Sequence, residues 1–249
     1  MHDPLLLLAV AAAGFAAGAL NAVAGSGSLL TFPLLLAIGY SPLVANVSNT
    51  VGMFVGNVSG AVGYRRELTG QRRAGLTLGA CALVGGIGGA VLLLALPPGV
   101  FKVVVPALIV LAVVLLLLQP RLARWREARG PTRSSRVALP LSILATAVYG
   151  GYFGAAQGVI FMATLGVFLD ESLQRLTGLK NVLAAAANGA AAVVFIAYGP
   201  VAWEPALVLA GSSLLGGQLG AGFGRRLPAP VLRVIIIVGG LAAVAKLLA

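Results

Sequence analysis

Charged side chains are scarce in this sequence. Only 9% of its 249 residues are Asp, Glu, Lys or Arg, whereas 59% are hydrophobic and the mean hydropathy is +1.03. A soluble domain usually carries charge at roughly a quarter of its positions. Uncharged runs such as residues 4–64, 74–96, 137–169 and 205–224 reach the ~20 residues that cross a bilayer as a helix. The composition therefore predicts a polytopic, all-α membrane protein.

Cysteine and histidine are almost absent, with one of each, Cys81 and His2. This excludes a disulfide framework, a Cys/His metal site and Cys-His or Ser-His catalysis. The acidic side chains Glu67, Asp170 and Glu171 map to loops or helix ends, as does Glu204, so no carboxylate relay for protons is indicated. We therefore expect neither an enzyme nor a bound metal or cofactor.

The chain has a net charge of +11, and its positive side chains are concentrated in two segments. Nine of the seventeen Lys and Arg residues lie there: Arg65, Arg66, Arg72, Arg73, Arg121, Arg124, Arg126, Arg129 and Arg133. The positive-inside rule identifies both segments as cytoplasmic. This pattern indicates that the protein lies in the plasma (inner) membrane of a bacterium-like cell, where it contacts lipid. It does not indicate nucleic-acid binding.

The stretch Gly25-Ser26-Gly27-Ser28 interrupts the first apolar run. Two glycines and two serines in succession weaken a helix. Irregular backbone inside a membrane survives where it is buried in protein or lines a wet cavity. The alternative is that these small residues let two membrane helices pack closely.

The expected helices fall into two sets of five, separated by a basic linker at residues 119–136. The first set covers residues 4–24, 28–39, 44–64, 74–96 and 100–118, and the second covers residues 137–155, 158–169, 174–198, 203–224 and 229–248. Residues 1–118 and 137–249 are thus two membrane repeats. One segment in each repeat is shorter than the hydrocarbon core, and whether it crosses together with its neighbour or re-enters stays open at this point.

The two halves resemble each other at one constant offset in the numbering, which aligns residues 85–101 with residues 216–232. Seven of seventeen positions are identical between these two stretches, and Gly27 and Asn57 correspond to Gly158 and Asn188. The loop charges do not correspond: residues 65–73 carry four arginines, whereas residues 196–204 carry none. This predicts an inverted-topology repeat with both termini outside the cell.

Several motifs occur in the order typical of one family. They are residues 14–33 (GFAAGALNAVAGSGSLLTFP), 44–51 (VANVSNTV), 64–68 (YRREL), 173–183 (LQRLTGLKNVL) and 216–221 (GGQLGA). Together they resemble the sulfite exporter TauE/SafE family over essentially the whole chain. The resemblance implies a small secondary-type permease for sulfite or an organosulfur anion. One departure is Gly154-Ala155-Ala156-Gln157-Gly158, which has fewer glycines than the family often has there.

Polar residues near the two breaks are the candidate site. In inverted-repeat transporters, half-helix N-termini aim free N–H groups and partial positive charge at a midplane substrate. Lys180 is the sharpest candidate, because a charge inside a span faces a cavity or a partner. The alternatives for Lys180 are snorkelling to the surface or pairing with Asp170 or Glu171. The candidate substrate-binding residues are Asn21, Gly25, Ser26, Gly27, Ser28, Asn46, Asn49, Gln157, Gly158, Lys180 and Asn181.

Other polar and small residues are better explained by packing. Asn57 and Asn188 recur at the repeat offset, which favours a structural role. The glycines around Gly85 and Gly216 form small-xxx-small faces for helix contact.

The sequence thus predicts a permease that moves a small anion, sulfite or an organosulfur or organic acid anion, by alternating access between the repeats. An anion or small-solute channel with a fixed pore is the alternative. A homo-oligomer is compatible with either reading.

Overall fold

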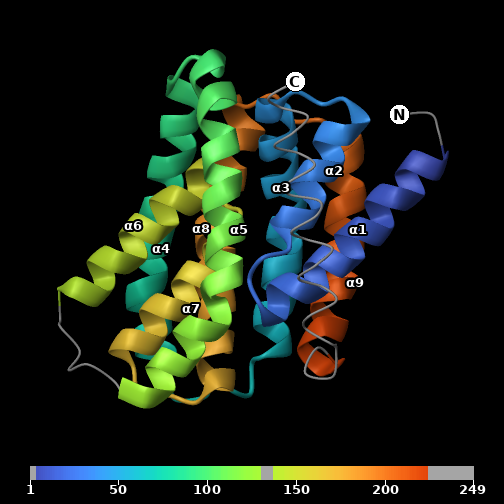
Figure 1. Cartoon of the computed structure of the whole chain (residues 1–249). Helices are drawn as coiled ribbons and strands as arrows, with labels where there is room; N and C mark the ends of the chain where they lie inside the picture. Colours follow the sequence, from blue (N-terminus) through green and yellow to red (C-terminus); the bar gives the residue numbers. More distant parts are fainter. Residues whose placement is uncertain (1–3, 130–136, 224–249) are drawn as a thin grey trace.

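The structure is a computed structural model that describes residues 4–129 and 137–223. This part of the chain is helical, with no strand (Figure 1). Its helices are α1 (Pro4–Val23), α2 (Ser28–Ile38), α3 (Pro42–Gly63), α4 (Arg72–Ala95), α5 (Pro98–Arg129), α6 (Ala138–Tyr152), α7 (Gln157–Phe168), α8 (Leu173–Tyr198) and α9 (Trp203–Phe223). The predicted all-helical fold is confirmed for these residues, and the expected helix at residues 229–248 lies outside them.

One predicted boundary is wrong. Helix α5 was expected to end near residue 118, but it continues to Arg129, into the expected linker. Ala, Arg, Leu and Glu dominate residues 121–129, and these residues have high helix propensity. The polar residues after residue 118 therefore end the apolar part of α5 but do not end the helix.

The two short helices return to the end of the molecule from which the chain entered. Helix α1 runs inward from one end, and after the break α2 leads back to that end (Figure 1). Helices α6 and α7 do the same from the opposite end. Between the two pairs, α3, α4 and α5 run the length of the molecule in alternating directions. Three full-length helices thus separate the two broken pairs, α1–α2 and α6–α7, in which two helices are joined by a break. The two broken pairs enter from opposite ends of the molecule.

Side-chain contacts fix which loops share an end. Ser48 Oγ in α3 accepts a hydrogen bond from the Ala202 backbone N–H at 2.8 Å. Burial raises the pKa of the nearby Tyr40 phenol, and the carboxylate of Glu204 raises it further. The connections α2–α3 and α8–α9 therefore lie at one end. At the other end, Gly178 in α8 packs against Tyr64 and Leu68.

Helices from the two halves interleave. Helix α4 packs against α6 and α8, and α9 packs against α1 and α3. A Cβ atom added at Gly86 would lie 2.2 Å from the Ala187 carbonyl oxygen, and one at Gly217 would lie 2.7 Å from the Gly56 carbonyl oxygen. The repeat offset relates these two contacts, because it aligns Gly86 with Gly217 and Gly56 with Ala187. The predicted packing role of the glycine faces is therefore confirmed at both.

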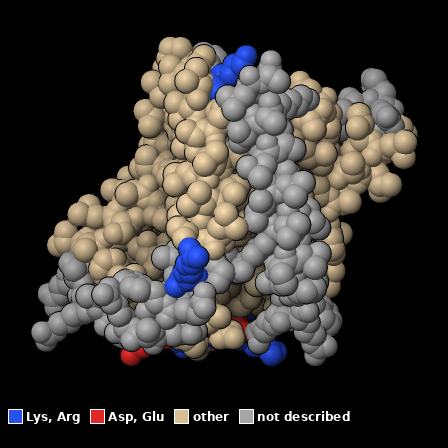
Figure 2. Space-filling model, viewed as in Figure 1, with Lys and Arg blue, Asp and Glu red and all other residues tan. Residues whose placement is uncertain are grey.

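The outside of the molecule suits a bilayer. Among the described residues, four helices are long and apolar enough to cross one: α1, α4, residues 99–118 of α5, and α8. Large apolar side chains such as Val103, Leu76 and Val193 are exposed on their surfaces. The charged side chains visible in Figure 2 lie toward the two ends, and the described surface between them is uncharged. The polar side chains of α3, by contrast, are buried in the protein.

Candidate functional site

The breaks between α1 and α2 and between α6 and α7 meet inside the molecule. The Gly158 N–H donates a hydrogen bond to the Gly25 carbonyl oxygen at 3.1 Å. A Cβ added at either glycine would lie 2.4 Å from the Cα of the other. Side chains therefore cannot be accommodated at this contact. Gly25 and Ala156, which the repeat offset aligns with each other, both have left-handed backbone, with φ of 77° and 57°.

Aromatic side chains support the meeting point. Phe32 in α2 packs edge-on against Phe153 in the second break, with ring centroids 5.3 Å apart. The Tyr149 hydroxyl donates to the Ala155 carbonyl oxygen at 2.6 Å. Both breaks are thus held by specific contacts, as irregular backbone inside a membrane protein must be.

A small polar cavity lies at this meeting point. Its volume is about 10 Å³, about enough to hold one water molecule. Six of its lining residues belong to the predicted set: Asn21, Gly25, Ser28, Gln157, Gly158 and Lys180. Four others complete the wall: Asn57, Gly154, Ala184 and Asn188.

Lys180 is fully buried in α8. Its ammonium donates to two carbonyl oxygens in the last turn of α1, those of Asn21 at 2.6 Å and Ala22 at 3.2 Å. Carbonyls at a helix end lack N–H partners within the helix, so the side chain acts as a C-terminal cap. An ammonium has three N–H donors, and these bonds use two of them. The third is available to a ligand in the cavity.

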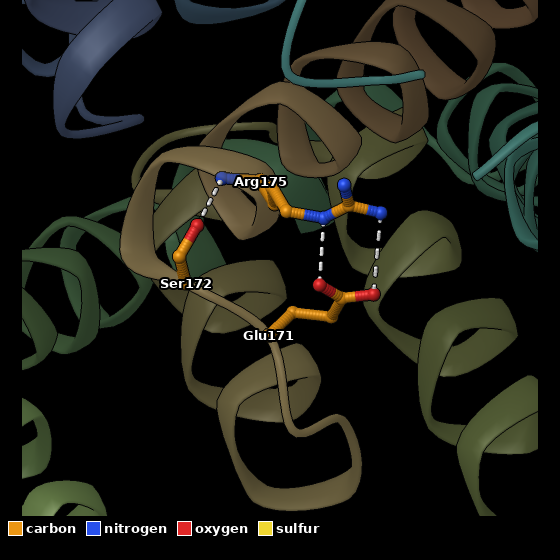
Figure 3. A network of polar contacts seen from close by, with 3 residues as sticks. All are labelled: Glu171, Ser172 and Arg175. Carbon is orange, nitrogen blue, oxygen red and sulfur yellow. Dashed lines mark hydrogen bonds and ion pairs between the residues drawn. The ribbon is translucent and has the colours of Figure 1, made fainter. Parts of the chain in front are cut away.

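Lys180 neither snorkels to the surface nor pairs with Glu171. It does not reach the surface, because none of it is exposed. Glu171 pairs instead with Arg175, one turn further along, with 2.6 Å between Nε and Oε2 (Figure 3). The same arginine donates its backbone N–H to the Ser172 side chain at the start of α8.

Several buried polar atoms at the cavity have no hydrogen-bond partner among the described residues. They include both amide atoms of Gln157, the Nδ2 of Asn57 and the Oδ1 of Asn188. Leaving such atoms unpaired costs about 1–3 kcal/mol each. Gln157 fits only because its neighbour is small: a Cβ at Gly150 would lie 1.8 Å from its Nε2. A bound polar ligand or water would satisfy these atoms.

The remaining predicted residues lie around the cavity without lining it. Asn46 donates to the Tyr152 carbonyl oxygen at 3.0 Å, and Asn181 donates to that of Ala22 at 3.0 Å. Asn49 accepts a short hydrogen bond from Thr31. These three amides connect helices, as buried amides in membrane proteins often do. Each of the first two still has an unpaired oxygen.

Two predicted residues of the first break also lie outside the lining. Ser26 is buried with its hydroxyl unpaired within the described structure. At Gly27, a Cβ would lie 2.1 Å from the Ala17 carbonyl oxygen, so this glycine permits close packing on α1. The packing reading thus applies to Gly27, whereas Gly25 forms the contact between the breaks.

The expected free N–H groups at the start of the second short helix are occupied. The N–H of Gln157 bonds to the Gly154 carbonyl oxygen, that of Gly158 to Gly25, and that of Val159 to Ala156. The left-handed residue Ala156 turns the backbone so that these local bonds form. In this conformation, α7 does not offer its N-terminus to a ligand.

Asn57 and Asn188 were assigned to structure from the sequence, but both line the cavity. One signal could have indicated Asn188: Lys180, Ala184 and Asn188 recur at every fourth position, which places them on one helix face. The described residues contain no group of three His, Cys, Asp or Glu side chains that could hold a metal ion.

Known proteins resemble the chain along its length. The family profile described as Sulfite exporter TauE/SafE matches residues 10–247. The probable membrane transporter protein YfcA of Escherichia coli K12 is 27% identical over all of this chain and 91% of its own. A probable membrane transporter protein, ORF9, of Sinorhizobium sp. is 24% identical over 98% of this chain and 93% of its own. No solved structure matches the chain significantly.

Proposed function

The chain belongs to the sulfite exporter TauE/SafE family of membrane transporters, and on this premise we propose that it carries a small anion through the cavity where its two breaks meet. The proposed substrate is sulfite or a related organosulfur or organic acid anion. The proposed mechanism is alternating access between the two halves.

One observation carries the anion assignment. Lys180 is fully buried at the cavity, and the described residues of the cavity wall include no Asp or Glu. A buried cation in a membrane protein needs a counter-charge or strong acceptors. The α1 carbonyls supply two acceptors, and an anion in the cavity would supply the third together with the missing negative charge.

The cavity size supports a transporter in an occluded state. About 10 Å³ holds a water molecule but not sulfite, which is a sulfur atom with three oxygens. The cavity must therefore widen to accept substrate. Helices α1 and α2 lead to one end of the molecule, and α6 and α7 lead to the other (Figure 1). Movement of one broken pair would open the cavity to its own side.

The interleaved packing supports an inverted repeat as the basis of this motion. Helix α4 packs on α6 and α8, and α9 packs on α1 and α3, which is the arrangement a two-fold operation would produce. Three full passes lie between the oppositely directed pairs, an odd number, as inversion requires. The short segments re-enter in pairs with their partners, so they leave this parity unchanged.

The charge distribution supports an orientation in the inner membrane. Arg65, Arg66 and Arg72 belong to the connection from α3 to α4, which Figure 1 shows at the end opposite the starts of α5 and α9, and Lys102 and Glu204 belong to those two starts. By the positive-inside rule the arginine-rich end is cytoplasmic. The basic segment after residue 118, which α5 carries to the same end, is then cytoplasmic as well.

A thermal-shift screen of the purified protein tests the substrate class. The panel is sulfite, sulfate, thiosulfate, sulfoacetate, taurine and acetate, with choline chloride as a cation control at equal ionic strength. A ligand that binds the native state stabilises it by RT ln(1 + [L]/Kd) and so raises the melting temperature. We expect at least one sulfur oxyanion to stabilise the protein. Stabilisation by choline alone would contradict the anion assignment.

A further inference from the structure

Two residues of the cavity wall, Asn21 and Asn57, form a chain of hydrogen bonds with Gly27, and the direction of this chain is fixed. The backbone N–H of Gly27 lies 2.7 Å from the side-chain oxygen of Asn21. The Asn21 Nδ2 lies 3.1 Å from the side-chain oxygen of Asn57. All three residues are buried.

The first member of this chain determines the others. A backbone N–H can only donate, so the Asn21 amide must place its oxygen toward Gly27. The Asn21 side-chain nitrogen then faces Asn57, so the Asn57 amide must accept this hydrogen bond through its oxygen. Although amide oxygen and nitrogen are assigned from such networks, here the network begins at a group that has only one option. The Asn57 Nδ2 is therefore left as a donor.

This donor is unpaired and belongs to the cavity wall. Asn57 is 2% exposed, it lines the cavity, and its Nδ2 has no partner among the described residues. Turning the amide over would set its nitrogen against the Asn21 nitrogen. To relieve that, Asn21 would have to turn its own nitrogen toward the Gly27 N–H. Reversing the Asn57 amide would therefore lose either the hydrogen bond between Asn21 and Asn57 or the one between Gly27 and Asn21.

The other two amides in the wall are not fixed in this way. Both amide atoms of Gln157 and the Oδ1 of Asn188 have no hydrogen-bond partner within the described structure. Either amide can present its oxygen or its nitrogen to a ligand. Asn188 is the repeat counterpart of Asn57. Each half therefore contributes an asparagine to the cavity wall, but the amide orientation is fixed only at Asn57.

We propose that Asn57 determines specificity in this cavity: its Nδ2, held in place through Gly27 and Asn21, donates to an oxygen of the transported anion. The proposal rests on the proposed function and extends it to one residue and one atom. Asn21 also accepts from Lys180 through its carbonyl oxygen. The same residue therefore positions both donors, and a ligand with a donor group at this corner is rejected.

The test compares Asn57→Leu with the matched variant Asn188→Leu, which removes the same amide from the repeat counterpart in the same cavity. Binding of sulfite, sulfate and sulfoacetate to the full-length protein is measured by titration calorimetry. Because a hydrogen bond to a charged ligand is lost, we expect Asn57→Leu to weaken binding about tenfold or more. Asn188→Leu should also weaken binding, but less than Asn57→Leu, since an amide that must be oriented on binding contributes less than one already fixed.

The outcomes separate this proposal from the function on which it rests. If the wild type binds none of the three anions, the proposed function fails. If the wild type binds and Asn57→Leu binds equally well, only the assignment of Asn57 fails. Equal losses in both variants would contradict the special role of the fixed donor. Should Asn57→Leu not fold, Asn57→Asp keeps the shape and the oxygen that Asn21 uses, and it must abolish anion binding.

Discussion

Replacing Lys180 with methionine removes the charge and its N–H donors but keeps most of the side-chain volume. The wild-type ammonium makes two hydrogen bonds to α1 and has one N–H left. A hydrogen bond to a charged partner contributes about 1.5–3 kcal/mol. Losing the one that reaches the ligand should weaken anion binding roughly ten- to a hundredfold. The anion also loses its counter-charge, so this is the lower limit of the effect.

The same substitution should leave the protein folded. Two α1 carbonyls lose their donor, at about 1–3 kcal/mol each. Against this, the variant no longer buries an ammonium, whose desolvation costs several kcal/mol. The two effects oppose each other, and we expect a sharp melting transition in detergent close to that of the wild type.

A neighbouring residue provides the control. Asn181 donates to the same Ala22 carbonyl oxygen, yet it does not line the cavity. Asn181→Leu therefore removes a helix contact without removing a ligand contact, and it should keep wild-type affinity in titration calorimetry with sulfite. Wild-type affinity in Lys180→Met would refute the role of Lys180 and reduce it to a helix cap.

Three other predictions concern single residues. Gly158→Ala places a Cβ against Gly25 and should destabilise the protein by about 1–3 kcal/mol in thermal melts; Gly211→Ala, where nothing lies within 4 Å, should not destabilise it. Gln157→Leu replaces an unpaired amide and should leave the melting temperature unchanged or raise it, while anion affinity falls; a large drop in stability would mean that the amide is satisfied by structure. Glu171→Gln breaks an ion pair with Arg175 whose side chains are about one-third exposed, and it should change stability by less than about 1 kcal/mol.

Much of the fold follows from local properties of the sequence. The uncharged runs and their lengths predict the helices, and the run of Gly and Ser residues predicts the first break. These signals are local, because helix formation depends on neighbouring residues. The far end of α5 was missed, since basic residues end the membrane-spanning part of a helix without ending the helix itself.

The site could be predicted only in part, because its residues meet through tertiary contacts. Gly25 and Gly158 touch, yet the repeat offset pairs Gly158 with Gly27. That offset relates equivalent positions, and it does not say which of them come into contact. Asn57 was attributed to structure for a similar reason: it does form a structural hydrogen bond, but with only one of its two amide atoms. The other atom becomes visible as a cavity group only when the positions of Asn21 and Gly27 are known.

Counterflow in proteoliposomes tests the central claim most directly. Vesicles containing the protein are loaded with the anion that stabilises it most in the thermal screen, and the labelled anion is added outside. A carrier that alternates between its two sides exchanges one for the other, so we predict saturable uptake with a transient overshoot that Lys180→Met abolishes. Uptake that rises linearly with concentration and shows no overshoot would instead indicate a fixed pore, and it would contradict alternating access at this cavity.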